Sequence, residues 1–159
     1  MMKMRRSDRQ VTDDNKIDEI IRRCTSIRLG FNDNGKVYIV PMSFGFCREN
    51  GERVFYFHSA SSGRKIDLIK ASDYASFQMD CDGRIYGEDT ACTYTTSFKS
   101  IFGEGRTEIL EEKEDKLKAL NVLMAQYTEK SDWTFDERYL PKMCVFRLTV
   151  TELSCKEHE

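Results

Sequence analysis

Residues 54–65 read Val-Phe-Tyr-Phe-His-Ser-Ala-Ser-Ser-Gly-Arg-Lys, and no other stretch of the 159-residue chain says more about its fold. Four consecutive apolar or aromatic residues, 54–57, are of types that favour a strand. Small polar residues follow, then the cations Arg64 and Lys65, and then residues 66–71 with apolar side chains at helical spacing. The order predicts a strand, a tight turn and the start of a helix.

This turn has the composition of an anion site, and phosphate fits it best. Hydroxyls and turn N–H groups donate hydrogen bonds, and the positive end of a helix points at the ligand. Arg64 adds a planar fork that matches phosphate oxygens. The alternative is an ordinary strand-to-helix turn with a solvated Arg-Lys pair.

Composition predicts one domain over residues 1–159, because 40% hydrophobic residues and only two prolines suit a single packed core. The net charge of −2 gives no basic face for nucleic acid. No apolar run approaches the ~18 residues of a membrane span. The charged N-terminus lacks the apolar segment of a signal peptide, so we expect a cytoplasmic protein.

Six irregularly spaced cysteines, none in a C-x-x-C pair, predict free thiols rather than a disulfide framework. Cys24 and Cys144 have apolar neighbours and are expected in the core. With only two histidines, no metal site is expected. The chain also lacks the glycine-rich motifs of dinucleotide and triphosphate sites and the Gly-x-Ser-x-Gly motif of hydrolases.

The apolar pattern predicts a mostly β protein, a closed β-barrel with peripheral helices. The expected strands cover residues 26–31, 37–46, 54–58, 74–81, 93–107 and 145–153, and the expected helices cover residues 15–24, 65–71 and 112–128. Turns are expected at residues 32–35, 48–52 and 82–83, a loop or short helix at 133–139, an extended arm at 1–10 and a mobile tail at 154–159.

Five segments, in order, resemble the flavin-binding split-barrel proteins, which are the superfamily of pyridoxamine-phosphate oxidases. The match is closest to the nitroimidazole-resistance (Nim) proteins within it. The segments are residues 4–13, 35–44, 57–65, 96–106 and 143–153. The fourth resembles a "Tyr-x-Ser-Val-x-Gly-x-Gly" strand, with Phe98 in place of the usual Tyr. The resemblance implies an FMN-binding split barrel.

The resemblance also implies a cofactor site. In that family the matching Arg64-Lys65 pair holds the phosphate of FMN, and the strand matching residues 40–42 runs along the isoalloxazine ring through backbone groups. The implied cofactor-binding residues are Val40, Pro41, Met42, Phe57, His58, Ser59, Ser62, Arg64, Lys65, Lys99 and Ser100. Pro41 lacks an N–H and therefore belongs at a sheet edge, with or without a ligand.

Two further implications concern catalysis and assembly. His58 matches a histidine beside the flavin and is the catalytic candidate; the alternative is a partly buried histidine bonded to backbone. Lys99 and Ser100 match a strand that reaches the flavin across a dimer interface; for Lys99 the alternative is a solvated barrel residue. The resemblance therefore implies a homodimer with flavin sites at its interface.

The function implied is that of an FMN-dependent oxidoreductase, similar to nitroimidazole reductases, with a small-molecule substrate. A true pyridoxamine-phosphate oxidase is less favoured, because the chain shows no second cluster of hydroxyls and cations for a substrate phosphate. The alternative from another class is a non-enzymatic flavin- or haem-binding module, for which His58 and His158 are the available axial ligands.

Overall fold

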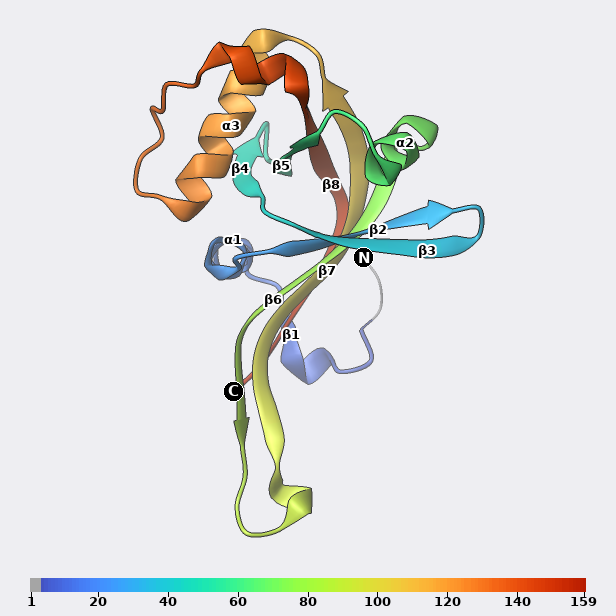
Figure 1. Cartoon of the computed structure of the whole chain (residues 1–159). Coiled ribbons are helices and arrows are strands. Elements are labelled where there is room, and N and C mark those ends of the chain that lie inside the picture. The colour runs from blue at the N-terminus through green and yellow to red at the C-terminus, as the bar shows by residue number, and fades with distance from the viewer. Residues whose placement is uncertain (1–3) are drawn as a thin grey trace.

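A computed structural model describes residues 4–159 as a curled antiparallel sheet with three helices against it (Figure 1). The strands follow the order β3-β2-β6-β7-β8-β5-β4, and β1 pairs with β8 outside this path. The two end strands, β3 and β4, are separated along the chain by only two residues. The sheet curls around a core without a hydrogen-bonded seam between β3 and β4. This is the split barrel that the resemblance implied, and not the closed barrel predicted from the apolar pattern.

The elements have these bounds. The strands are β1 (Gln10–Val11), β2 (Ile27–Asp33), β3 (Lys36–Met42), β4 (Gly45–Glu49), β5 (Glu52–Ala60), β6 (Tyr74–Tyr86), β7 (Thr95–Leu110) and β8 (Met143–His158). The helices are α1 (Asp14–Arg23), α2 (Arg64–Ala71) and α3 (Lys113–Tyr127), with short 3-10 turns at Ser7–Arg9, Ala91–Thr93 and Glu137–Lys142.

Strand β5 explains why the opening stretch is apolar on both strand faces. Phe55 and Phe57 lie in the barrel core, whereas Val54 and Tyr56 lie in a second cluster beneath α3. Full burial of a side chain such as Phe55 contributes roughly 1.5–3 kcal/mol. Helix α1 covers another part of the barrel with the buried residues Ile17, Ile20 and Ile21, the face predicted from their spacing.

Two tight turns form where asparagine and glycine allow a positive φ. Asn34 and Gly35 join β2 to β3, and Asn50 and Gly51 join β4 to β5. Both turns were predicted. The single strand expected over residues 37–46 was wrong, because the chain leaves β2 after Met42 and begins to pair with β5 at Gly45. At Gly45 the backbone of α3 comes so close that a Cβ atom would lie 2.5 Å from Leu123 Cα.

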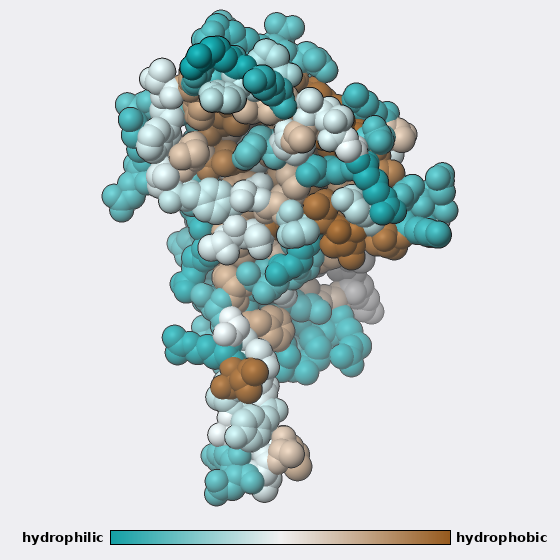
Figure 2. Space-filling model, viewed as in Figure 1, coloured by the Kyte–Doolittle hydropathy of each residue, from teal (hydrophilic) through white to brown (hydrophobic). Residues whose placement is uncertain are grey.

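The predicted turn at residues 82–83 is instead a bulge within β6. Asp82 has a φ of 59°, and the pairing of β6 with β7 resumes at Arg84 after the bulge. Both strands therefore continue into a long hairpin that projects from the barrel (Figure 1). Figure 2 shows a hydrophobic residue on this hairpin, where Ile85, Tyr86 and Tyr94 are exposed.

The predicted tail was also wrong. Residues 154–158 belong to β8, which pairs with β7 as far as His158 and with Val11 of β1 at Cys155. These polar residues form a strand because partner strands lie on both sides of them. Residues 1–3 of the predicted arm lie outside the described residues, and the rest of the arm forms a 3-10 turn and the start of β1. No helix within residues 4–159 has both the length and the apolar character needed to cross a bilayer.

Candidate functional site

The N-terminal end of α2 offers uncapped hydrogen-bond donors at the position predicted for an anion. Strand β5 ends at Ala60, and the helix begins at Arg64 after a turn of small residues. Gly63 has a φ of 130°, a conformation that residues with a side chain rarely adopt. No side chain caps the helix, and its first internal hydrogen bond comes from Asp67 N–H to the Gly63 carbonyl. The preceding N–H groups therefore remain available to a ligand.

Lys65 is the most informative residue of this region. It is partly buried, and burial lowers the pKa of its ammonium group, while the nearby Cys144 acts in the opposite direction. It forms no ion pair with any residue that the structure describes. Cys144 also pairs across the sheet with Ser59, so Lys65 and Ser59 lie around the same residue. A desolvated cation without an acidic partner is stabilised by an incoming anion.

Arg64 is held by the β2–β3 hairpin. Its Nη2 and Nε atoms lie 2.6 and 2.9 Å from Asp33 Oδ2, and its guanidinium lies 4.4 Å from the centre of the Tyr38 ring. Its side chain is still 54% exposed. Asp33 and Tyr38 were missed by the sequence reasoning, which treated residues 32–35 only as a turn. Nothing in one sequence signals a contact between this turn and a helix 31 positions later.

Strand β3 places the predicted ring-binding residues at the edge of the sheet. It pairs with β2 alone among the described strands, and Pro41 is exposed there, as its missing N–H predicts. Met42 is buried and Val40 partly buried, so these two meet a ligand mainly through their backbone. The outward side of β3 carries Val37 and Ile39, which are 77% and 63% exposed.

The other residues of the β5 loop differ in access. The ring of Phe57 is fully buried and stacks on Phe146 at a centroid distance of 4.8 Å, so only its backbone can meet a ligand. His58 points to the opposite face of the strand from Phe57 and is exposed. Ser62 is exposed in the turn, and Ser59 Oγ donates to the Ala60 carbonyl. His58 and Ser59 therefore offer polar groups near the helix start.

Lys99 and Ser100 lie in a different part of the same chain. His58 pairs with Val145, which pairs with Leu110, and Lys99 lies eleven residues further along β7. At about 3.3 Å per residue this is roughly 35 Å along the strand. Lys99 instead lies 3.3 Å from Asp82 Oδ2, beside the β6 bulge. One chain therefore does not bring Lys99 and Ser100 close to His58 and the start of α2.

A broad hollow of about 760 Å³ lies beside Lys99 at the base of the projecting hairpin. Its lining includes Arg23, Arg84, Phe98 and His158, so it combines cations with aromatic surface. The His158 ring lies 3.3 Å from Thr95 Oγ1, measured from Nε2. None of the residues at the start of α2 lines this hollow.

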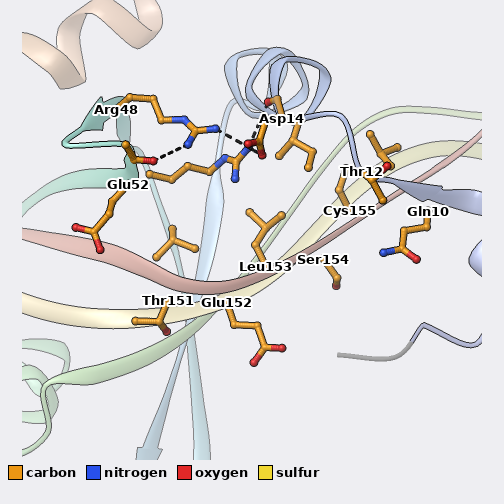
Figure 3. A pocket seen from close by; sticks show the side chains of 15 residues that line it. Gln10, Thr12, Asp14, Arg48, Glu52, Thr151, Glu152, Leu153, Ser154 and Cys155 are labelled. Carbon is orange, nitrogen blue, oxygen red and sulfur yellow. Dashed lines mark hydrogen bonds and ion pairs between the residues drawn. The ribbon is translucent and has the colours of Figure 1, made fainter. Parts of the chain in front are cut away.

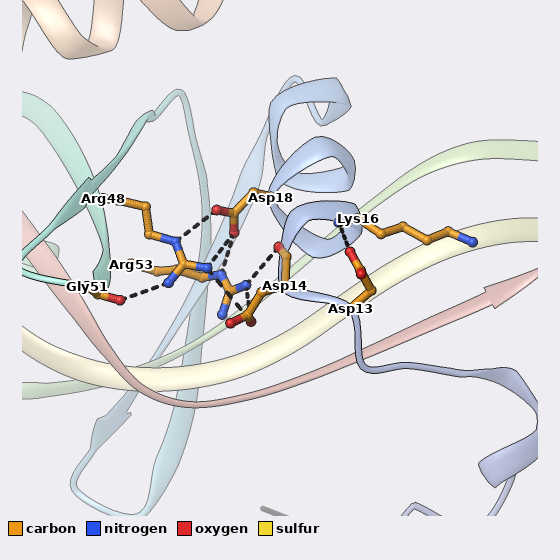
Figure 4. A network of polar contacts seen from close by, with 7 residues as sticks. All are labelled: Asp13, Asp14, Lys16, Asp18, Arg48, Gly51 and Arg53. Carbon is orange, nitrogen blue, oxygen red and sulfur yellow. Dashed lines mark hydrogen bonds and ion pairs between the residues drawn. The ribbon is translucent and has the colours of Figure 1, made fainter.

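A second hollow, of about 310 Å³, lies between the start of α1, the β4–β5 turn and β8 (Figure 3). Its cations are already paired. Arg53 Nε and Arg48 Nε lie 2.7 and 2.8 Å from the two carboxylate oxygens of Asp18, and Arg53 Nη2 lies 2.8 Å from Asp14 Oδ1 (Figure 4). Arg53 lowers the pKa of the Asp14 carboxyl by a hydrogen bond and by its charge. This network joins α1 to the β4–β5 hairpin, and no predicted site residue lines the hollow.

The family follows from a comparison of the sequence with family models. Residues 13–157, nearly the whole chain, match the model described as pyridoxamine 5'-phosphate oxidase. The chain belongs to this family. The family match confirms the predicted membership and accords with the split-barrel topology described above. A search of curated protein sequences with this chain finds no match.

Solved structures of similar fold come from several bacteria. A candidate 5-nitroimidazole antibiotic resistance protein of Bacteroides thetaiotaomicron aligns with a TM-score of 0.80 at 23% identity, over 93% of this chain and 86% of that one. An FAD and heme binding protein of Mycobacterium smegmatis aligns with a TM-score of 0.81 at 13% identity, over 95% of this chain and 74% of that one. The flavocytochrome Anf3 of Azotobacter vinelandii aligns with a TM-score of 0.78 at 19% identity, over 99% of this chain and 72% of that one. At these identities the likeness shows the fold alone.

Proposed function

We propose that this family member is an FMN-dependent oxidoreductase that acts on a small molecule. The observation that carries the proposal is the partly buried Lys65, without an acidic partner among the described residues, beside the uncapped start of α2. The residues present fit a flavin phosphate, because N–H donors, the exposed Ser62 hydroxyl and two cations lie around one turn. Bound FMN would supply electron transfer between a reduced donor and an acceptor.

Arg64 and Lys65 have different parts in this proposal. Asp33 and the Tyr38 ring fix the Arg64 guanidinium, so it is already oriented when the phosphate arrives. Lys65 supplies an ammonium group whose pKa burial lowers and an adjacent phosphate would raise. Each charge-assisted contact contributes roughly 1.5–3 kcal/mol to binding.

The ring system would lie along the free edge of β3. Backbone groups around Val40 and Pro41 are available there because β3 pairs on one side only among the described strands. The exposed side chains of Val37 and Ile39 add apolar surface on the same strand. His58 is the residue that we expect to hydrogen-bond the flavin or a bound substrate, since its side chain is exposed beside the phosphate turn.

The second wall of the flavin site would come from another copy of the chain. Lys99 and Ser100 are about 35 Å along the strand from the level of His58, so they can reach the phosphate turn only from a partner. A twofold axis would make two equivalent sites. Light scattering of the flavin-loaded protein should give about twice 18.6 kDa. A flavin-saturated monomer would contradict this arrangement.

The substrate class that we infer is a nitroaromatic compound, by analogy with the nitroimidazole-resistance protein of the same fold. Complete reduction of a nitro group to an amine takes six electrons and six protons and releases two water molecules. The assay supplies a reduced nicotinamide as electron donor and follows loss of the nitro absorbance. No turnover by a fully flavin-loaded protein would contradict the enzymatic part of the proposal.

A non-enzymatic module for flavin or haem is the second candidate, because two proteins of the same fold are a flavocytochrome and an FAD and heme binding protein. The absorption spectrum of the purified protein distinguishes these cases. FMN gives a yellow protein with flavin bands, and haem gives a red protein with a Soret band. A Soret band that disappears on substitution of His58 or His158 would replace the leading proposal.

A further inference from the structure

Two cysteine side chains that the proposed function does not use lie in the same part of the core, at the end of α1. Cys24 follows the last residue of the helix, and Cys81 lies on β6 immediately before the bulge. Cys24 belongs to the core cluster of the barrel, Cys81 packs against the same cluster, and each thiol affects the pKa of the other. Arg23, which precedes Cys24, and Asp82, which follows Cys81, form an ion pair in which Arg23 Nη2 lies 2.7 Å from Asp82 Oδ1. An ion pair thus holds together the two backbone segments that carry the thiols.

The two thiols differ in access. Cys24 is buried in the barrel core, and its Sγ also donates to the Ile20 carbonyl at 3.3 Å. Cys81 is partly exposed, and the adjacent Asp82 and Gly83 line the 760 Å³ hollow through which a small molecule can approach. The bulge at this point interrupts the β6–β7 ladder, so local adjustment of the backbone disturbs few hydrogen bonds.

We propose that Cys24 and Cys81 are a modification site that forms a reversible disulfide under oxidation by a hydroperoxide. The Cys81 thiolate attacks the peroxide, an S–O bond forms, the O–O bond breaks, and an alcohol or water leaves. The Cys24 thiolate then attacks the Cys81 sulfur, an S–S bond forms, and the oxygen leaves as water. Two thiols are oxidised and one peroxide is reduced. A dithiol reverses the bond by exchange.

The surroundings of the pair set its rate. Burial raises the pKa of both thiols, and Asp82 raises that of Cys81 further. The nearby Cys24 and the charges of Arg23 and Lys99 act the other way on Cys81. Because Cys81 is also the more exposed of the two, it is the thiol that attacks first. Because the thiolate is scarce at neutral pH, disulfide formation should be slow there and should accelerate as the pH rises.

Intact-mass and peptide mapping of the full-length protein treated with hydrogen peroxide test this site. The wild-type protein should lose two hydrogen atoms, link the peptides of Cys24 and Cys81, and recover its mass with dithiothreitol. Cys92→Ser is the matched control, because Cys92 is exposed and lies elsewhere on the hairpin, and it should behave like the wild type. Cys81→Ser should form no internal bond.

Cys24→Ser removes only the second thiol, so its Cys81 should stop at a sulfenic acid that a dimedone probe traps. Near-ultraviolet circular dichroism checks that each variant is folded. The proposal is overturned if the wild type stays reduced as the pH is raised, or if Cys81 pairs with Cys155, which interacts with it electrostatically. An unchanged internal bond in Cys81→Ser would overturn it too. None of these outcomes depends on flavin binding, which is measured separately.

Discussion

The start of α2 and the network beneath α1 both contain cations, but only in the network is each described cation paired with a carboxylate. Arg48 and Arg53 each reach carboxylate oxygens of Asp14 or Asp18, and together they join a helix to a hairpin. Lys65 is partly buried too, yet it contacts no carboxylate among residues 4–159. The first arrangement is complete in the folded chain, whereas the second becomes complete with an anion. This difference separates a structural cluster from a binding site.

Substitution of Arg53 gives the largest expected effect, and the effect is on folding. Its side chain is only 12% exposed, and Arg53→Ala leaves Asp18 with Arg48 as its remaining partner. We expect the free energy of unfolding to fall by about 2–3 kcal/mol, a value reduced for the partial exposure of the partners. Urea denaturation measures it. Flavin affinity of the folded fraction should stay unchanged, and a selective loss of flavin would remove the contrast between the two regions.

Substitution of Lys65 should have the opposite signature. Lys65→Ala should raise the Kd for FMN about ten- to a hundredfold, equivalent to roughly 1.5–3 kcal/mol, because one charge-assisted contact is lost. Stability should stay the same or rise slightly, since a desolvated charge is removed. Fluorescence titration gives the Kd. The control is Lys113→Ala, which removes an exposed lysine paired with Glu137 on α3. Equal Kd values for the two variants would contradict the phosphate assignment.

The two regions should also respond to opposite ends of the pH range. Arg53 lowers the pKa of Asp14 in the folded state, so its contribution to stability is present above the unfolded pKa and is lost as the pH falls through the lowered value. In the proposed site Lys65 would bind phosphate only when protonated, and burial lowers its pKa. FMN affinity should therefore fall on the alkaline side, starting below the usual range of lysine. Titrations across the pH range in Lys65→Ala should lack this alkaline fall.

Substitution of Lys99 gives the smallest expected effect. Its ammonium already lies 3.3 Å from Asp82, so in the proposed dimer it would offer a partner's flavin only a partly neutralised charge. Lys99→Ala should weaken FMN binding by up to about 1 kcal/mol, or roughly fivefold. Lys113→Ala again provides the control in the same titration. A loss as large as that of Lys65→Ala would mean that the phosphate lies at Lys99 instead.

Local chemistry made much of the fold predictable. The apolar run of β5 and the Asn-Gly turn before β3 appear where the sequence suggests them. The last part of β8 was missed because its residues are polar and its pairing depends on β7 and β1. The bulge at Asp82 was taken for a turn, since the same residue types allow a positive φ in both.

The candidate site divides in the same way. Ser59, Arg64 and Lys65 lie around one turn because they are close in sequence, and the local pattern alone indicated an anion site. The Asp33 and Tyr38 contacts of Arg64 arise from tertiary packing, which no local pattern encodes. The free cysteines agree with their irregular spacing, and both predicted core thiols are buried. The placement of Cys24 and Cys81 in one core cluster again depends on the packing of α1 on β6.

A comparison of FMN with riboflavin, in the wild type and in Lys65→Ala, tests the central claim most directly, since the two ligands differ only by the phosphate. The wild type should bind FMN at least ten- to a hundredfold more tightly than riboflavin. Lys65→Ala should lose affinity for FMN and keep its affinity for riboflavin. Equal affinities of the wild type for both ligands, or an equal loss of both in the variant, would contradict a phosphate site at the start of α2.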